Sequence, residues 1–357
     1  MNFMGFSSQI SLSLFLVLAI GSVLASSRLL SNEPWMIEKH EKWMNFHGRV
    51  YKDNIEKTER FQIFNENVKR IETLNKMNRG FTLGVNAFAD LTNEEFRASR
   101  TGYKRQSKSN HFDLHLKSKS KSKSKSKSKS FKYENSTGVL ASTIDWRKNG
   151  AVTSIKNQGE CGCCWAFSTV ASMEGLNQIK TGKLVSLSEQ ELVDCDTEFD
   201  EGCEGGLMDT AFDFIKSHGG LTTEANYPYK ATDGKCNTKR AAVNSVSIHG
   251  HENVPANNEK ALLAAVAHQP VSVAIEGGGF DFQFYSGGVF KGECGTDLDH
   301  AVVVIGYGVE KKDGSKYWLV KNSWGTGWGE KGFMRIKRGD GPKEGLCGIA
   351  MDASYPI

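Results

Sequence analysis

The chain has 357 residues, of which 39% are hydrophobic, and a formal net charge of +4 at pH 7. That length accommodates one large or two ordinary domains with a hydrophobic core. The charge is uneven, because residues 1–138 carry 24 Lys and Arg against 13 Asp and Glu, whereas residues 139–357 carry 21 against 28. The acidic larger part argues against a protein that binds nucleic acid or an anionic membrane.

The first residues are typical of a secretory signal peptide. Residues 1–27 contain no charged side chain, Leu12–Leu24 is nearly all apolar, and three small residues follow from Ala25 to Ser27. The apolar run is short for a bilayer span, although no Lys or Arg precedes it. An uncleaved membrane anchor is the alternative. We assign residues 1–25 to a signal peptide and expect entry into the secretory pathway, where disulfides form.

Residues 26–100 are predicted to form a helical domain. Six residues recur at spacings of three or four and so share one stripe of a helix: Glu56, Arg60, Phe64, Asn67, Ile71 and Asn75. Any amphipathic helix with a docking face could show this stripe. Alternate residues from Gly84 to Asp90 then favour a short strand.

Residues 101–138 are predicted to be a flexible linker in which order fades from Tyr103 onward. Lys117–Ser130 consists of seven Lys-Ser pairs, which repel one another and cannot bury a core. A role in binding nucleic acid or heparin is the alternative to a solvated linker. Asn135 begins an Asn-Ser-Thr glycosylation sequon in this segment.

All eight cysteines lie between Cys161 and Cys347, which favours a disulfide-containing domain over residues 139–357. A helix is predicted from Trp165 to about Lys180, with Thr181-Gly182 ending it. Cys164 therefore lies at the N-terminus of this helix. A helix N-terminus stabilises a thiolate. A buried structural thiol is the alternative, but the glycine nearby favours an accessible sulfur. Cys161 and Cys164 resemble half a zinc site without its second half, so we expect no metal and no cofactor.

His300 is the histidine with the best context for activating that thiol, because a thiol needs a base to become a nucleophile at moderate pH. It precedes the apolar strand Ala301–Ile305, and a second strand follows at Tyr317–Val320 after a polar hairpin loop. A hairpin centred near Lys311 would place Asn322 opposite His300. The amide could then fix the tautomer and orientation of the imidazole.

Taken together, these motifs resemble the papain and cathepsin family of cysteine proteases. Cys161–Trp165 is similar to the family's nucleophile segment, and Asn322–Gly325 is similar to the segment that supplies its orienting Asn. The helical stripe over 56–75 and the spaced residues over 84–90 match the two motifs of the family's inhibitory propeptide. The resemblance covers nearly all of the chain after the signal peptide.

The resemblance implies an α+β, two-lobed papain-like fold, with a helical lobe and an antiparallel β-barrel-like lobe, preceded by a helical inhibitory prodomain. It implies that Cys164 attacks the peptide carbonyl, that His300 protonates the leaving amine and that Asn322 orients His300. Gln158 would donate to the oxyanion together with the Cys164 backbone N–H. The substrate would be bound by Gly205, Gly206, Leu207, Met208, Ala274, Leu298, Asp299, Ala301, Trp324 and Asp352. The family's bridges map onto Cys161–Cys203, Cys195–Cys236 and Cys294–Cys347.

The function implied is that of an endopeptidase made as an inactive precursor. Its expected partners are protein and peptide substrates and its own prodomain as inhibitor, with no nucleic acid and no membrane span after signal removal. The enzyme is expected to be a monomer in the vacuole, the lysosome or outside the cell. Two alternatives are a catalytically dead binding or storage protein and a basic interaction protein that uses the Lys-Ser tract.

The chain departs from the family pattern at two places. Cys163 stands where the family usually has Ser or Ala, as in some plant members linked with senescence; it is either a small packed side chain or a redox switch. Ala141 stands near the mature N-terminus, where the family often has Pro, so the processing point is not defined by that signal.

Overall fold

A computed structural model describes residues 34–104, 131–134 and 140–357, so the predicted signal peptide, the Lys-Ser tract and Asn135 lie outside the described residues. The chain divides into two compact units, Met1–Glu66 and Asn67–Ile357. None of the helices among the described residues is long and apolar enough to cross a membrane.

The first unit contains helix α2, Pro34–His47, and the beginning of α3, Asn54–Asn75. Asp53 starts α3, because its Oδ1 accepts the backbone N–H groups of Ile55 and Glu56 at 2.9 and 2.8 Å. The buried ring of His40 lies against Phe64, with ring centroids 4.9 Å apart. The helix predicted over residues 56–75 is therefore present.

The second unit begins with the remainder of α3, followed by strand β1, Phe81–Leu83, and helix α4, Asn93–Arg100. The strand predicted over residues 84–90 is wrong, because residues 87–90 form a turn. Asn86 explains this turn: its Oδ1 accepts the Phe88 N–H at 3.0 Å, while its Nδ2 donates to the Gln283 carbonyl at 2.8 Å. The alternation of Phe88 and Asp90 reflects two side chains buried from a turn.

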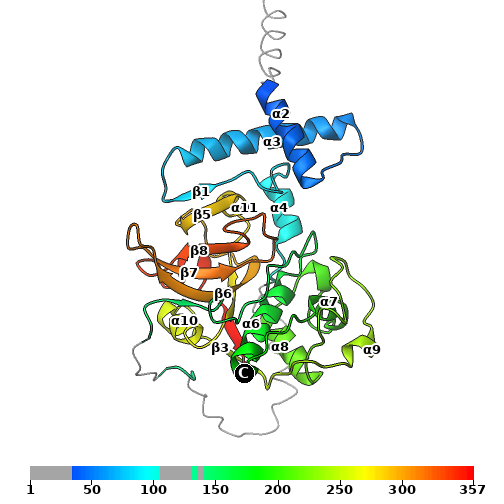
Figure 1. Ribbon diagram of the computed structural model, residues 1–357, viewed down its shortest axis with the longest axis vertical. Helices are drawn as coiled ribbons and strands as arrows, with labels where there is room; N and C mark the ends of the chain where they lie inside the picture. The colour runs from blue at the N-terminus through cyan, green and yellow to red at the C-terminus, as the bar shows by residue number, and fades with distance from the viewer. Residues whose placement is uncertain (1–33, 105–130, 135–139) are drawn as a thin grey trace, which may run out of the picture. The chain divides into compact units, whose positions relative to one another are not determined.

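The described residues of the second unit contain one open, nine-stranded sheet with the order β1-β5-β8-β7-β6-β4-β9-β3, and β2 pairs with β6. Its remaining strands are β2 Ile144–Asp145, β3 His251–Asn253, β4 Val271–Ile275, β5 Tyr285–Phe290, β6 His300–Val309, β7 Lys316–Lys321, β8 Phe333–Lys337 and β9 Ala353–Pro356. The pairing is antiparallel except between β5 and β8. Strand β1 lies beside β5 at one edge (Figure 1), so residues preceding the linker complete the sheet. The mixed helix-and-sheet architecture is as expected, but the sheet does not close into a barrel.

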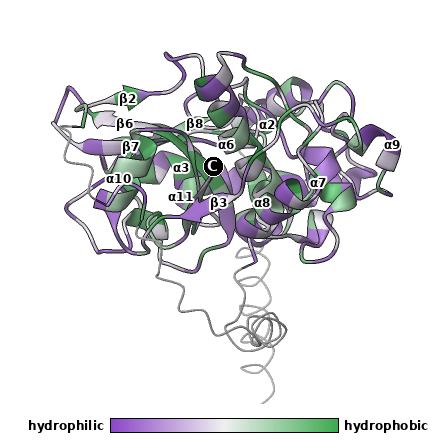
Figure 2. Cartoon of the chain, turned by 90° about the horizontal axis from the view of Figure 1, so that it is seen from below, coloured by the Kyte–Doolittle hydropathy of each residue, from purple (hydrophilic) through white to green (hydrophobic). Residues whose placement is uncertain are grey.

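Helix α6, Cys164–Thr181, is followed by five further α-helices among the described residues, of which α7 and α8 pack against it. These five are α7 Glu189–Cys195, α8 Met208–Ser217, α9 Thr238–Ala241, α10 Glu259–Val266 and α11 Phe280–Gln283. Helix α6 ends at Gly182, whose φ of 72° lies in the left-handed region that favours glycine. The predicted helix and its stop signal are both present. Figure 2 shows α9 in hydrophilic colours, and none of its residues is buried.

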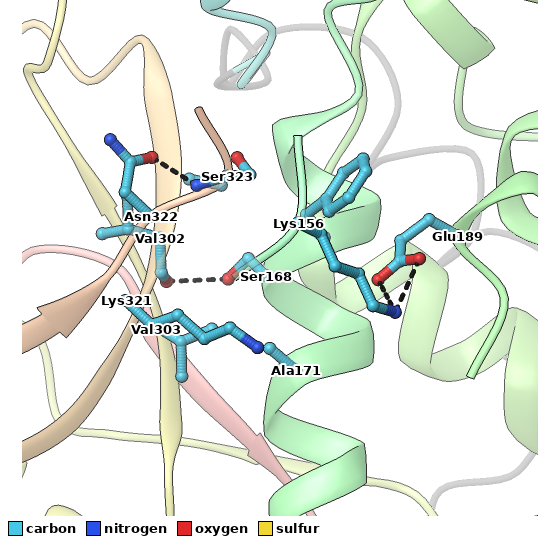
Figure 3. A pocket seen from close by; sticks show the side chains of 11 residues that line it. Lys156, Ser168, Ala171, Glu189, Val302, Val303, Lys321, Asn322 and Ser323 are labelled. Atoms are coloured by element: carbon cyan, nitrogen blue, oxygen red, sulfur yellow. Dashed lines mark hydrogen bonds and ion pairs between the residues drawn. The ribbon is translucent and has the colours of Figure 1, made fainter. Parts of the chain in front are cut away.

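Helix α6 is fastened to the sheet by buried hydroxyl groups. Ser168 donates to the Val302 carbonyl of β6 at 2.8 Å, and Ser272 of β4 donates to the Ser168 carbonyl at 2.9 Å. A charged cluster lies alongside these contacts (Figure 3). In it, the Lys156 Nζ contacts Glu174 at 3.1 Å and Glu189 at 2.7 Å, so the buried carboxylates have cationic partners.

The hairpin of β6 and β7 has a different register from the one predicted. Val303 pairs with Lys321, Val304 pairs with Val320, and the register then shifts before Gly306. Asn322 follows β7 rather than pairing with His300 across the ladder. The shift arises because the connecting turn is centred beyond Lys311, with a bulge in β6.

Candidate active site

Cys164 is the first residue of α6, and its sulfur faces the start of β6. The Sγ accepts the backbone N–H of Ala301 at 3.4 Å. Because Ala301 directly follows His300, the thiol lies next to the segment that carries the imidazole. The aligned peptide dipoles at the N-terminus of α6 favour negative charge at this sulfur. The side chain of Cys164 is fully buried in this form of the chain.

His300 is held by Asn322 in one tautomer. Its Nε2 lies 2.8 Å from the Asn322 Oδ1, which also accepts the Ser323 N–H at 2.8 Å. An amide oxygen only accepts, so Nε2 carries the proton and Nδ1 has a free lone pair. The Nδ1 atom has no hydrogen-bond partner among the described residues. Trp324 covers the imidazole, with ring centroids 4.5 Å apart, and shields the bond to Asn322 from water.

Gln158 is fixed so that its amide N–H groups point into the same site. Its backbone N–H donates to the Ser323 carbonyl at 2.8 Å, and its Oε1 accepts the Ser323 hydroxyl at 2.7 Å. Its Nε2 donates to the carbonyls of Cys161 at 2.9 Å and Arg100 at 3.3 Å. The second acceptor belongs to the segment that precedes the linker. A carbonyl oxygen therefore already accepts from the predicted oxyanion donor.

The end of α4 at Arg100 and the non-helical residues up to Lys104 cover the site. The N–H groups of Gly102 and Tyr103 donate to the Asp299 carbonyl at 3.1 and 3.0 Å, and the Gly206 N–H donates to the Gly102 carbonyl at 3.0 Å. A Cβ on Gly102 would lie 1.7 Å from the Gly162 carbonyl oxygen, so only glycine permits this approach. The expected loss of order is not seen at Tyr103 and Lys104. Pairing with Gly206 orders this part of the predicted linker.

Tyr103 is buried, and its side chain lies in the same apolar cluster as several of the predicted substrate-binding residues. Its hydroxyl donates to the Asp352 carboxylate. It belongs to one apolar cluster with Leu207, Met208, Ala274, Leu298 and Ala301. The Gly205 Cα is also close, since a Cβ there would lie 2.6 Å from the Gly102 carbonyl oxygen. Trp324 donates from Nε1 to the Arg100 carbonyl at 3.3 Å. The segment therefore contacts five of the residues predicted to bind substrate: Gly205, Gly206, Asp299, Trp324 and Asp352.

Burial changes the protonation of the thiol and the imidazole. It raises the pKa of Cys164 to about 12, although the Ala301 N–H opposes this shift. It lowers the pKa of His300 to about 4, although the bond to Asn322 opposes this shift. Burial also raises the pKa of the neighbouring Asp299 to about 6. The covered site therefore holds a neutral thiol and a neutral imidazole across the intermediate pH range.

The three disulfides are Cys161–Cys203, Cys195–Cys236 and Cys294–Cys347, and Cys163 and Cys164 are free. Among the described residues, no group of three His, Cys, Asp or Glu side chains could hold a metal ion. Sequence reasoning missed two contributors to the site. The sequence analysis included Ser323 only within the motif Asn322–Gly325 and gave it no role of its own. Tyr103 was assigned to the linker, although an aromatic residue between Gly102 and Lys104 is a signal for a buried contact.

Comparison with known proteins gives matches over most of the chain. Residues 140–357 match the model of the "Papain family cysteine protease" family, and residues 40–96 match the "Cathepsin propeptide inhibitor domain (I29)". The chain is 58% identical over 352 residues to the senescence-specific cysteine protease SAG12 of Arabidopsis thaliana, covering 97% of this chain and 98% of that protein. It is 55% identical over 349 residues to vignain of Ricinus communis, covering 98% and 93%.

Solved structures give the same result. The proform of Amb a 11, a cysteine protease and major ragweed pollen allergen, is 43% identical with a TM-score of 0.80, covering 92% of this chain and 97% of that chain. The recombinant stem bromelain precursor is 45% identical with a TM-score of 0.78, covering 90% and 98%.

The depressed pKa of His300 predicts how the ring titrates in the precursor. A covered imidazole binds a proton less readily than an exposed one, whose pKa is 6.5, so lowering the pH from 6.5 toward 4 favours states in which the covering segment has lifted. In a Cys164→Ser precursor, NMR of labelled histidine should give a His300 midpoint near pH 4. Removing the prosegment, which is the part of the chain before residue 139, should raise that midpoint. A midpoint above about pH 6 in the intact precursor would contradict the effect of burial.

Proposed function

Because this chain belongs to the papain family of cysteine proteases, we propose that Cys164 is its nucleophile, with His300, Asn322 and Gln158 as the other catalytic residues. The chain is a cysteine endopeptidase made as a zymogen, and its own prodomain is the inhibitor. The observation that carries the residue assignment is the Arg100 carbonyl, which accepts from both Gln158 Nε2 and Trp324 Nε1 at 3.3 Å. A peptide carbonyl thus occupies the cleft with its oxygen on the proposed donor.

The proposed reaction proceeds in two halves. In the open site, the thiol proton moves to His300 Nδ1, and the Cys164 thiolate attacks the carbonyl carbon of the peptide bond. The oxyanion accepts from Gln158 Nε2 and from the Cys164 N–H, the C–N bond breaks, and the imidazolium protonates the leaving amine. Water, deprotonated by His300, then hydrolyses the thioester. The products are a carboxylic acid and the regenerated thiol.

The oligomeric state, the substrates and the compartment of the enzyme are further parts of the proposal. We propose that it acts as a monomer on protein and peptide substrates after entering the secretory pathway, with the vacuole, lysosome or extracellular space as its destination. The three disulfides support an oxidising route. The names of the senescence-specific relatives favour a role in senescence.

The test of the assignment is a pair of matched substitutions at adjacent cysteines. Cys164→Ser should abolish peptide hydrolysis with the fold and the three bridges intact, because an alcohol has a far higher pKa than a thiol and forms no stable ion pair with His300. Cys163→Ser should retain most of the activity. Each precursor is first processed at acid pH by an added active protease. Hydrolysis of a fluorogenic peptide is then measured. A dead Cys163→Ser enzyme beside an active Cys164→Ser enzyme would reverse the assignment.

The ion pairs between the prosegment and the peptidase part support activation by acid. Among the described residues, the prosegment supplies the cation in each of these pairs: Arg79–Asp281, Arg97–Asp299, Arg100–Glu160 and Lys104–Glu201. Protonating the carboxylates removes these attractions. The opposite net charges of the two parts of the chain favour the same contact.

Incubating purified precursor at about pH 4–5 should therefore yield a mature form that starts near Val139. Asp281→Asn mimics one protonated carboxyl and should raise the midpoint pH of processing. Asp313→Asn is the matched control, since Asp313 pairs with Lys291 within the peptidase part at 3.0 Å. Processing is followed by N-terminal sequencing and gel electrophoresis. A precursor that is fully active at pH 7 without cleavage would refute acid activation.

We propose that the residues around Tyr103 form the pocket for the substrate residue two positions before the cleaved bond, and that this pocket has a dual specificity. Its lining is apolar, so bulky apolar side chains should be preferred, while Asp352 can accept a charge-assisted hydrogen bond from Arg or Lys. The tolerance for basic residues should grow as Asp352 ionises. Asp352→Ala should lower kcat/KM for an Arg-Arg substrate about tenfold relative to a Phe-Arg substrate. An unchanged ratio between the two substrates would remove Asp352 from the pocket.

A further inference from the structure

Cys163 is a buried thiol that the proposed reaction does not use. Its Sγ lies 3.0 Å from the Tyr229 hydroxyl, whereas the Cys164 Sγ faces the Ala301 N–H of β6. The two adjacent thiols thus have different hydrogen-bond partners. This difference gives Cys163 a role distinct from that of the nucleophile.

The direction of the hydrogen bonds at Tyr229 follows from the number of protons. The Tyr229 hydroxyl lies 2.7 Å from the Gln158 backbone carbonyl oxygen. A carbonyl only accepts, so the single phenolic proton is donated to Gln158. At the contact between Cys163 and Tyr229, the thiol must therefore be the donor. The result is a directed chain from the Cys163 S–H through the Tyr229 O–H to the Gln158 carbonyl.

The chain keeps both of its protons in the working pH range of the enzyme. Burial raises the pKa of Cys163 and also that of Tyr229. The Tyr229 ring is fixed independently, because it packs edge-on against Phe167 with ring centroids 4.9 Å apart. Its backbone N–H also donates to Glu224 Oε1 at 2.9 Å. The phenolic oxygen is therefore a fixed point for its two partners.

Gln158 is anchored from both sides of the site. Ser323, which follows β7, holds its backbone N–H and its Oε1 at 2.8 and 2.7 Å. Tyr229 holds its carbonyl from the helical side. With these atoms fixed, the position of Nε2 relative to the nucleophile is set before substrate binds. A donor positioned in advance requires no reorganisation when the oxyanion forms.

We propose that Cys163 is a positioning residue that acts through Tyr229 to hold Gln158 in place as the oxyanion donor. The inference rests on the proposed role of Gln158 and extends it to the residue where this chain has Cys instead of Ser or Ala. Serine can donate to Tyr229 in the same way, whereas alanine cannot. The hydrogen-bond chain thus makes Cys163→Ser and Cys163→Ala functionally different.

The experiment compares acid-processed enzymes made from full-length precursors. Cys163→Ala and Tyr229→Phe should each lower kcat roughly three- to tenfold with KM unchanged, as expected for one neutral hydrogen bond that acts in the transition state. Affinity for a peptide aldehyde, which forms an oxyanion on Cys164, should fall by a similar factor. Cys163→Ser should restore kcat to within about twofold.

Tyr227→Phe is the matched control. It also removes a buried hydroxyl from the same lobe, but this hydroxyl donates to Asp194 at 2.7 Å and does not contact Gln158. It should lower the Tm while leaving kcat at the parent value. The pH limbs of kcat/KM should stay in place in all the variants, because the Cys164–His300 titration is not altered. A shifted acid limb in Cys163→Ala would overturn the proposal.

A double substitution separates failure of this inference from failure of the role of Gln158. Gln158→Ala should lower kcat about 100-fold, and adding Cys163→Ala should lower kcat no further. An unchanged kcat in Gln158→Ala would reject Gln158 as donor and the inference with it. If Gln158→Ala is slow but Cys163→Ala matches the parent, or if the two losses multiply, only the positioning role of Cys163 is rejected.

Discussion

The junction between α6 and the start of β6 is the constraint on which the site depends. Cys164 begins the helix and His300 begins the strand, so the two reacting groups meet only if these ends are held together. The bonds of Ser168 to Val302 and of Ser272 to Ser168 fix this alignment, and both bonds are buried. The charged cluster around Lys156 joins the same helix to α7. The nucleophile is therefore positioned by the packing of two rigid elements.

The same junction makes inhibition both steric and electrostatic. Covering the cleft with residues 100–104 blocks access, and it also removes water from the thiol and the imidazole. Since charge separation is costly in an unhydrated site, burial favours the neutral pair by raising one pKa and lowering the other. Opening the cleft then restores access and hydration together. One covering segment thereby suppresses binding and nucleophile formation at once.

Local signals accounted for the helices of the fold. Helix α6, its glycine stop and the α3 stripe were predictable because each depends on residues within a few turns. The hairpin register was not, since the connecting turn is centred beyond Lys311, with Val309 paired to Lys316. The strand over 84–90 failed because Asn86 bonds to a distant carbonyl and to its own turn. Tyr103 was missed because its order comes from Asp352 and Gly206, which lie far away in the sequence.

For docking on the peptidase part, the positions of the prosegment charges matter more than the net charge of the prosegment. The segment before residue 139 is strongly basic, but the cations that pair with carboxylates of the peptidase part are Arg79, Arg97, Arg100 and Lys104. At physiological ionic strength, charges are screened beyond about 8 Å, so distant lysines add little to these contacts. Arg79 and Lys104 lie on either side of α4 in the sequence. Each pairs with a carboxylate on the surface that the covering segment must occupy. Selectivity for this docking arises from four local pairs and the glycine contact at Gly102, where the backbones approach too closely for any other residue.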